Sequence, residues 1–260
     1  MAKVRTPLVS GNWKMHHNHL EALHCVEKLH MRLSSEDLAK CDVSVHPPFT
    51  DLRTVQTYLA GEKRARILLG AQHCHPDEKG AFTGEVSVSM VAKLAVKLVI
   101  VGHSERRQLF GETDAGVNTK VKSILKHHMT PIVCVGETLE ERDAEEAEAR
   151  VRSQLVAGLA GVTAEQVASM VVAYEPIWAI GTGRTASADD AQNMCASIRA
   201  VVADMFGAET GLRIRIQYGG SAKPANAAEL LERPDIDGLL VGGAALDPDD
   251  FAKIVQAAPR

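Results

Sequence analysis

The chain has 260 residues, of which 45% are hydrophobic and 24% are charged. This composition is typical of globular proteins with a substantial core, and the length fits either one α/β barrel or two smaller α/β domains. The formal net charge of −4 provides no electrostatic reason to expect a nucleic-acid or membrane partner. We therefore expect a small metabolite as the ligand, and neither nucleic acid nor membrane as a partner.

The sequence also predicts the compartment. No apolar stretch has the length of a signal peptide or of a membrane span, which needs about 20 apolar residues. The cysteines are odd in number, widely spread and never arranged as Cys-x-x-Cys, which disfavours both a disulfide framework and a zinc knuckle. We expect reduced thiols and a cytoplasmic protein. The cysteines are Cys25, Cys41, Cys74, Cys134 and Cys195.

Strand-like and helix-like segments alternate along the chain. Apolar runs predict strands at residues 8–12, 42–46, 66–71, 97–101, 131–135, 171–175, 212–218 and 237–241. Helical periodicity and capping residues predict helices at residues 20–33, about 50–59, 88–96, 104–110, 113–128, 138–159, 188–205, 225–231 and 248–255. Eight strand-then-helix units with short linkers predict a single (β/α)8 barrel domain over residues 1–260. A doubly wound sheet is the rival fold, but its Gly-x-Gly-x-x-Gly turn is missing after the first strand.

In such a barrel the carboxyl ends of the strands meet at one face, where active sites are built. Glu175 ends the sixth predicted strand, and Pro176 stops the ladder directly after it. Two glycines, Gly181 and Gly183, follow in the next loop and give it a permissive hinge. This pattern indicates a general base beside a lid, although an ordinary exposed glutamate remains the alternative.

Two other strand ends carry polar side chains. Asn12 and Lys14 lie two residues apart at the end of the first strand, so period-2 alternation points both the same way. His103 follows the fourth strand and precedes Ser104, which we expect to be the N-cap of a short helix. Because a helix N-terminus disfavours the imidazolium, we expect His103 to act as a neutral hydrogen-bond donor.

Glycine pairs end the last two strands, at Gly219-Gly220 and Gly242-Gly243. Loops after strands seven and eight form the usual phosphate site of this fold, and glycines leave backbone N–H groups accessible there. Each feature also has a structural explanation, such as a turn or a solvated side chain. Together they favour a proton-transfer site for a small phosphorylated carbonyl compound.

Several motifs resemble those of the triosephosphate isomerase family, in order and over nearly the whole chain. They are Asn12-Trp13-Lys14, Gly102-His103-Ser104-Glu105-Arg106-Arg107, Tyr174-Glu175-Pro176, Trp178-Ala179-Ile180-Gly181-Thr182-Gly183, Tyr218-Gly219-Gly220-Ser221 and Val241-Gly242-Gly243-Ala244. The chain differs from the family pattern at His16, Arg184 and Ala245, and we expect the differences at Arg184 and Ala245 to affect only the fine tuning of the lid and the rim.

The resemblance implies a reaction and a role for each site residue. Glu175 would remove the proton next to the carbonyl of dihydroxyacetone phosphate, and His103 would polarise and protonate the enediolate oxygens. Lys14, supported by Glu105, would stabilise negative charge. Asn12 would position the substrate, while backbone N–H groups at Gly181, Ser221, Gly242 and Gly243 would bind its phosphate, with no metal and no cofactor. The residues expected to latch the lid are Glu137, Tyr174, Trp178, Tyr218 and Ser221.

The resemblance further implies a homodimer. The predicted loop at residues 72–84 is longer than an ordinary βα connection. In the family this loop enters the neighbouring active site, so Phe82 would be its apolar anchor and Thr83 its polar tip at the partner's Asn12 and Lys14.

Other functions remain as alternatives. A metal-binding protein is suggested by the histidines 16, 17, 19 and 24 and by His73-Cys74-His75, although none has a standard zinc spacing. A catalytically silent relative would keep the glycines and lose the acid–base pair, yet both Glu175 and His103 are present. A barrel isomerase for a larger phosphorylated sugar is the nearest enzymatic alternative.

Overall fold

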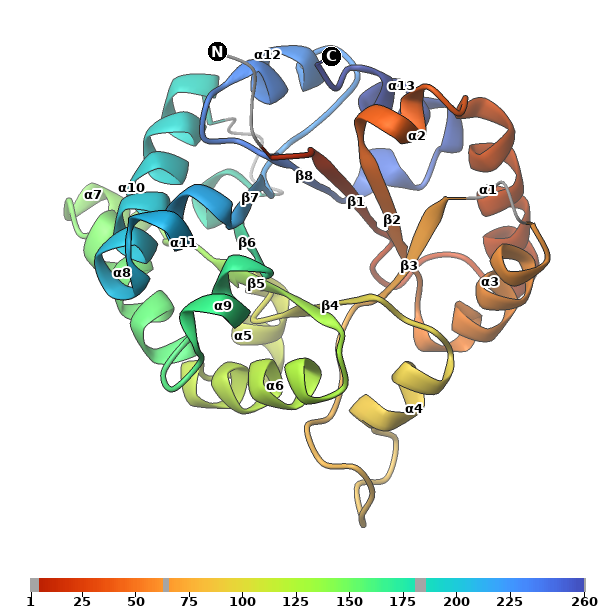
Figure 1. The fold of residues 1–260 in the computed structure, drawn as a ribbon, viewed down its shortest axis with the longest axis horizontal. Helices are drawn as coiled ribbons and strands as arrows, with labels where there is room; N and C mark the ends of the chain where they lie inside the picture. The colour runs from red at the N-terminus through yellow and green to blue at the C-terminus, as the bar shows by residue number, and fades with distance from the viewer. Residues whose placement is uncertain (1–4, 63–65, 181–185, 260) are drawn as a thin grey trace.

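The computed structural model describes residues 5–62, 66–180 and 186–259. Parallel strands follow one another around a closed barrel in chain order, and β1 pairs with β8 to complete it (Figure 1). The strands are β1 (Leu8–Asn12), β2 (Asp42–His46), β3 (Ile67–Ala71), β4 (Leu98–Val101), β5 (Thr130–Val135), β6 (Val171–Tyr174), β7 (Arg215–Tyr218) and β8 (Gly238–Val241). The predicted (β/α)8 barrel is therefore confirmed.

Helices surround the barrel on its outside (Figure 1). They are α1 (His19–Arg32), α2 (Asp37–Lys40), α3 (Phe49–Gly61), α4 (Val88–Lys93), α5 (Ser104–Phe110), α6 (Asp114–Lys126), α7 (Leu139–Asp143), α8 (Ala147–Gly158), α9 (Ala164–Ala168), α10 (Ala188–Phe206), α11 (Ala208–Arg213), α12 (Ala227–Glu232) and α13 (Pro248–Gln256). Short 3-10 turns η1 (Ile177–Ala179) and η2 (Gly243–Ala245) follow β6 and β8. Within the described residues no helix is long and apolar enough to cross a membrane.

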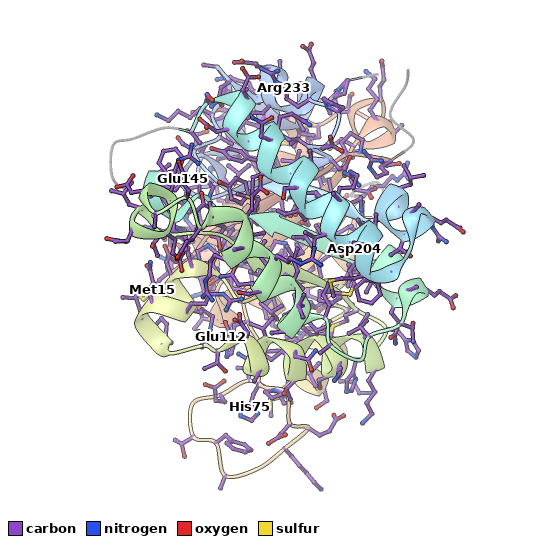
Figure 2. All side chains as sticks on the ribbon, turned by 90° about the vertical axis from the view of Figure 1, so that its left-hand side faces the viewer. Met15, His75, Glu112, Glu145, Asp204 and Arg233 are labelled. Atoms are coloured by element: carbon purple, nitrogen blue, oxygen red, sulfur yellow. The ribbon has the colours of Figure 1, made fainter. Side chains whose placement is uncertain are left out.

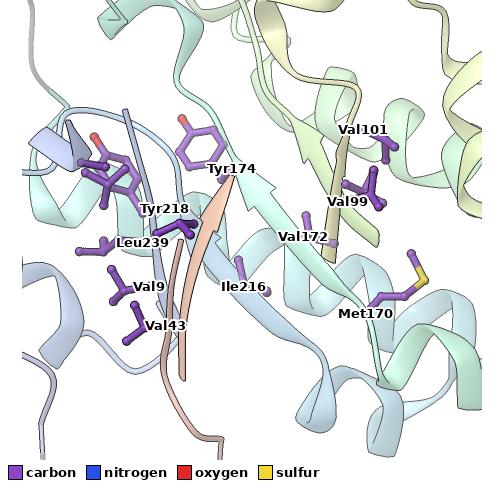
Figure 3. Packing of buried hydrophobic residues seen from close by; sticks show 14 of the residues in the cluster. Val9, Val43, Val99, Val101, Met170, Val172, Tyr174, Ile216, Tyr218 and Leu239 are labelled. Carbon is purple, nitrogen blue, oxygen red and sulfur yellow. The ribbon is translucent and has the colours of Figure 1, made fainter. Parts of the chain in front are cut away.

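Alternation along the strands divides the core into two layers. One set of side chains faces the helices; Figure 3 shows members of it, including Val9, Val43 and Ile216. The other set fills the barrel and includes Leu98, Ile100, Ile132, Val171 and Leu240. The interior is therefore a packed core, which confines ligand binding to the ends of the barrel.

Part of this interior is polar. The Ser44 hydroxyl lies 2.8 Å from Ser10 Oγ and 3.1 Å from His46 Nε2, while Gln217 Nε2 donates to Ser10 Oγ at 2.8 Å. The His46 ring lies where β3 has a glycine: a Cβ atom on Gly70 would be 2.1 Å from it. These side chains join β7, β1 and β2 and bring the His46 ring against β3.

Several predicted boundaries were wrong. The helix predicted at residues 138–159 is two helices, α7 and α8, because the chain turns at Glu145, which has a φ of 59°. The strand predicted from residue 212 begins at Arg215, since α11 occupies residues 208–213. The short helices α2, α9 and α11 were not predicted, because segments of four to six residues carry too little periodicity.

Two predicted helix starts also differ. The N-cap of α5 is His103, whose Nδ1 accepts from the N–H of Glu105, so Ser104 is the first helical residue. Helix α3 begins at Phe49 after Pro48, one residue before the capping pair Thr50 and Asp51. In both cases the helix starts one residue earlier than the capping preference predicted, while the preceding strand ends where it was predicted to end.

The connection between β3 and α4 projects away from the barrel (Figure 1), and Figure 2 shows His75 on it. Its base is held to the barrel: His73 Nε2 lies 3.0 Å from Glu85, and its Nδ1 lies 3.1 Å from Lys120 Nζ. Beyond this base, Phe82 and Thr83 are exposed. The tip therefore reaches into solvent from an anchored base.

Candidate active site

The carboxyl ends of β1, β4 and β6 bring together the three predicted catalytic side chains. His103 Nε2 lies 3.0 Å from Oε1 of Glu175, and both side chains are buried. Lys14 is connected to the same group through Glu105, whose carboxylate lies 2.5 Å from Lys14 Nζ and 3.7 Å from His103 Nδ1. Lys14, His103, Glu105 and Glu175 thus form one polar cluster, although they lie far apart in the sequence.

Lys14 has an unusual backbone conformation. Its φ is 52°, in the left-handed region that costs a residue with a Cβ atom about 1 to 2 kcal/mol. Its N–H donates to Asn12 Oδ1 at 3.1 Å, and its carbonyl accepts from Gln72 Nε2 at 2.7 Å. The side chains of Asn12 and Gln72 thus hold the turn that orients Lys14. The sequence analysis did not identify Gln72, although its position at the end of β3 is a signal that could have found it.

The contacts of His103 define which nitrogen carries the proton. Nδ1 accepts a hydrogen bond of 3.2 Å from the N–H of Glu105, in the first turn of α5. An atom that accepts from a backbone N–H carries no proton itself, so the proton of the neutral ring is on Nε2. This arrangement directs the N–H of the ring toward Glu175, as a neutral donor requires.

Glu175 is held at the start of α5. Its Oε2 accepts from the N–H of Ser104 at 2.9 Å, and its Oε1 accepts from the Ser104 hydroxyl at 3.2 Å. Its backbone continues the β5–β6 ladder, because its N–H donates to the carbonyl of Val135 at 2.8 Å. A helix N-terminus stabilises the carboxylate form, which is the form a general base needs.

Of the two glycine-rich strand ends, the end of β8 lies beside Lys14. A Cβ atom built on Gly242 would be 3.9 Å from Lys14 Nζ, whereas one on Gly243 would meet nothing within 4 Å. Ser221, on the β7 side, is half-buried, and its carbonyl accepts from Asn226 at 3.0 Å. Gly181, the remaining predicted phosphate donor, lies outside the described residues. The Lys14 ammonium group therefore lies close to the backbone of Gly242, which carries no side chain.

The first part of the predicted lid is attached to Glu137. Oε1 of Glu137 accepts from the Tyr174 hydroxyl at 2.9 Å and from Trp178 Nε1 at 2.8 Å. Arg142 lies over the Trp178 ring, 4.3 Å from its centroid. Burial raises the pKa of the Glu137 carboxyl, and the two hydrogen bonds partly offset that effect. Three of the expected latch residues, Glu137, Tyr174 and Trp178, are therefore in contact before the segment at 181–185 begins.

Cys134 is a site residue that the sequence analysis did not identify. It points into the barrel interior from β5, and its thiol contacts Glu175. Burial raises the pKa of Cys134 well above its usual value, and the Glu175 carboxylate adds to this effect. The thiol therefore stays protonated beside the carboxylate. All five cysteines are buried thiols.

The described residues give no support to the alternative of a metal-binding protein. No group of three or more His, Cys, Asp or Glu side chains there could hold a metal ion. Instead, His73 lies against Lys120 and Glu85, while His17 packs edge-on against Trp13 at 5.1 Å.

Comparisons with known proteins agree with this geometry. The family model described as triosephosphate isomerase matches residues 7–258. A protein named triosephosphate isomerase from Streptomyces avermitilis is 52% identical over 252 residues, covering 97% of each chain. The protein of that name from Carboxydothermus hydrogenoformans is 50% identical over 255 residues, covering 98% of this chain and 100% of its own. With its barrel, its strand-end cluster and these matches, the chain belongs to the triosephosphate isomerase family.

Proposed function

We propose that Glu175, His103 and Lys14 interconvert dihydroxyacetone phosphate and glyceraldehyde 3-phosphate through an enediolate. The observation that carries this proposal is the 3.0 Å contact between Nε2 of His103 and the Glu175 carboxylate. A carboxylate beside a neutral N–H donor can remove a proton from carbon while the donor stabilises the charge that develops on the adjacent oxygen. The chain is accordingly an isomerase.

Each polar group has one task in this mechanism. Glu175 takes the proton from one carbon and returns it to the neighbouring carbon. His103 donates its Nε2 proton to one enediolate oxygen and receives a proton from the other. Lys14 supplies the positive charge that favours the anionic intermediate, and Glu105 orients its ammonium group through the 2.5 Å ion pair.

The carboxylate must move for this chemistry to begin. Both oxygens of Glu175 accept hydrogen bonds from Ser104, which hold the carboxylate at the start of α5. The segment that follows Glu175 ends in the glycines 181 and 183, and we propose that its closure over the substrate releases Glu175 from Ser104. Closure also excludes water from the enediolate.

We place the phosphate of the substrate at the ends of β7 and β8. Backbone N–H groups at Ser221, Gly242 and Gly243 are the donors in this proposal, with Gly181 added from the lid and Asn12 positioning the carbon end. Support comes from the closeness of Gly242 to Lys14, whose Nζ would lie 3.9 Å from a Cβ atom built on the glycine, so an anion bound by this backbone would be near a cation.

We further propose a cytoplasmic homodimer. Large apolar side chains are exposed on the loops after β1 and β3 and on α4: Met15 is 94% exposed, Phe82 44% and Met90 55%. Exposed apolar residues next to a catalytic lysine mark a protein interface, and Figure 2 shows Met15 at the surface. In the dimer Phe82 is the anchor of the projecting loop, and Thr83 contacts Asn12 and Lys14 of the other subunit.

A coupled assay of glyceraldehyde 3-phosphate formation tests the activity. Dihydroxyacetone phosphate should be converted rapidly by the purified chain, without added metal and in the presence of a chelator. Larger phosphorylated sugars serve as controls and should react slowly. Binding of dihydroxyacetone phosphate without turnover would contradict the proposal and favour a catalytically silent relative.

A further inference from the structure

Arg107 is a half-buried charged residue that has no role in the proposed mechanism. Its side chain is 11% exposed, and it lies one turn into α5, after His103 and Ser104. Nε donates to the carbonyl of Gly102 at 2.7 Å, Nη2 donates to the carbonyl of Cys134 at 3.3 Å, and Nη1 donates to Asp114 at 2.5 Å. A guanidinium with donors in a fixed fork can make these three contacts at once.

These contacts lie just beyond the last residue pair of β4 and β5, where sheet hydrogen bonds no longer connect the two strands. The β4–β5 ladder ends at the pair Val101 and Val133, because Gly102 turns into the left-handed region with a φ of 70°. The β5–β6 ladder, by contrast, continues until the N–H of Glu175 reaches Val135. His103 is therefore attached to the neighbouring strand less directly than Glu175 is.

Arg107 bridges this gap. It joins the carbonyl just before His103 to the carbonyl of Cys134, whose thiol lies against Glu175. The guanidinium packs directly on Gly102, since a Cβ atom there would be 2.8 Å from Nη2. Gly102 is also held through its N–H group, which donates to Glu112 at 3.1 Å.

We propose that Arg107 is a positioning residue that sets the distance between the His103 ring and the Glu175 carboxylate. It replaces the missing ladder hydrogen bond between β4 and β5, and Asp114 neutralises its charge. This inference rests on the proposed roles of His103 and Glu175. Because misplacement of catalytic groups by about 1 Å costs on the order of 10²-fold in rate, the loss of Arg107 should affect turnover more than substrate binding.

The test compares Arg107→Lys with Arg199→Lys. Arg199 has the same 11% exposure and also bridges backbone carbonyls and carboxylates, but at the amino ends of β7 and β8. A lysine retains the charge in each case and cannot reproduce the fork. Arg107→Lys should lower kcat by about 10- to 100-fold with KM within about threefold, whereas Arg199→Lys should lower the melting temperature and leave kcat within about twofold.

A second measurement reports on position directly. The ¹⁵N–¹H signal of His103 Nε2 should shift in Arg107→Lys and stay in place in Arg199→Lys. If Arg107→Lys does not fold, Asp114→Ala frees Nη1 instead and should lower kcat several-fold. Unchanged kcat in a folded Arg107→Lys, or equal kcat losses in the two lysine variants, would overturn the inference. An inactive wild-type protein would instead contradict the proposed function.

Discussion

The carbonyl oxygen of Glu175 occupies the place that a side chain on Gly136 would need. A Cβ atom built on Gly136 would lie 1.8 Å from that oxygen, far inside van der Waals contact. Gly136 cannot move away easily, because its N–H donates to Gln154 at 2.8 Å and its carbonyl accepts from the same side chain at 3.2 Å. The backbone position of Glu175, the proposed base, therefore depends on Gly136, which lies in the loop after the neighbouring strand β5.

Gly136→Ala should consequently displace Glu175. We expect kcat to fall by at least about 10²-fold with a smaller change in KM, because the carboxylate would start from the wrong position. Gly158→Ala is the matched control: its Cβ atom would meet Val117 at 3.6 Å, an ordinary contact, so activity should stay normal. Steady-state kinetics on both variants test this prediction. Full activity in Gly136→Ala would contradict it, because the backbone would then adjust without loss of catalysis.

The second prediction concerns the length of the Glu175 side chain. Glu175→Asp withdraws the carboxylate by one methylene, so kcat should fall by about 10²-fold while KM changes only a few-fold. Glu175→Gln removes the base and should be nearly inactive. Glu165→Asp, at an exposed position in α9, is the control and should behave as wild type. Near-normal turnover in Glu175→Gln would exclude this residue as the base.

The third prediction concerns stability and pH. Burial lowers the pKa of His46 from 6.5 to about 4, so the neutral ring is favoured in the folded state. The unfolded chain binds the proton first as the pH falls. The contribution of His46 to the free energy of unfolding is therefore complete above pH 6.5 and is lost progressively between pH 6.5 and 4, by about 3 kcal/mol.

Urea unfolding across that pH range measures this contribution. His46→Ala should be less stable than wild type at pH 7, yet its free energy of unfolding should fall less steeply toward pH 4. Some dependence will remain, because burial also lowers the pKa of His73 to about 4. Parallel curves for the two proteins would mean that His46 titrates alike in the folded and unfolded states.

The fourth prediction concerns the lid. Trp178→Phe keeps an aromatic ring under Arg142 and removes the N–H that donates to Glu137 at 2.8 Å. A weaker latch should let more enediolate phosphate escape, and the escaped intermediate decomposes to methylglyoxal and inorganic phosphate. The ratio of methylglyoxal to isomerised product should rise several-fold. Tyr58→Phe, at a hydroxyl 2.8 Å from His30 on the outer helices, is the control and should leave that ratio unchanged.

The fifth prediction concerns assembly. Phe82→Asp combined with Thr83→Arg places charges at the exposed tip of the loop between β3 and α4, which we expect to lie in the partner's site. The variant should sediment as a monomer and lose activity by orders of magnitude, although both changes are remote from Glu175 in the same chain. Val156→Asp, at an apolar side chain of similar exposure on α8, is the control and should leave sedimentation and activity unchanged. A fully active wild-type monomer would disprove the dimer.

Much of the architecture was predictable because it depends on local patterns. Apolar runs of four to six residues placed each strand within a few residues, and β1 and β2 at their observed bounds. Since parallel strands of a barrel end at one face, Asn12, His103 and Glu175 could be assigned to one site without coordinates. Where periodicity was short or ambiguous, as at α9 and α11, the same reasoning failed.

The sequence by itself determined which chemical groups are available and on which strand ends they stand, because alternation and turn residues are properties of neighbouring positions. Only the tertiary structure decided how those groups are held. That Gln72 supports Lys14 and that Arg107 connects Gly102 to Cys134 are contacts between segments up to 58 residues apart. Such contacts depend on the three-dimensional spacing of strands, which no local pattern encodes.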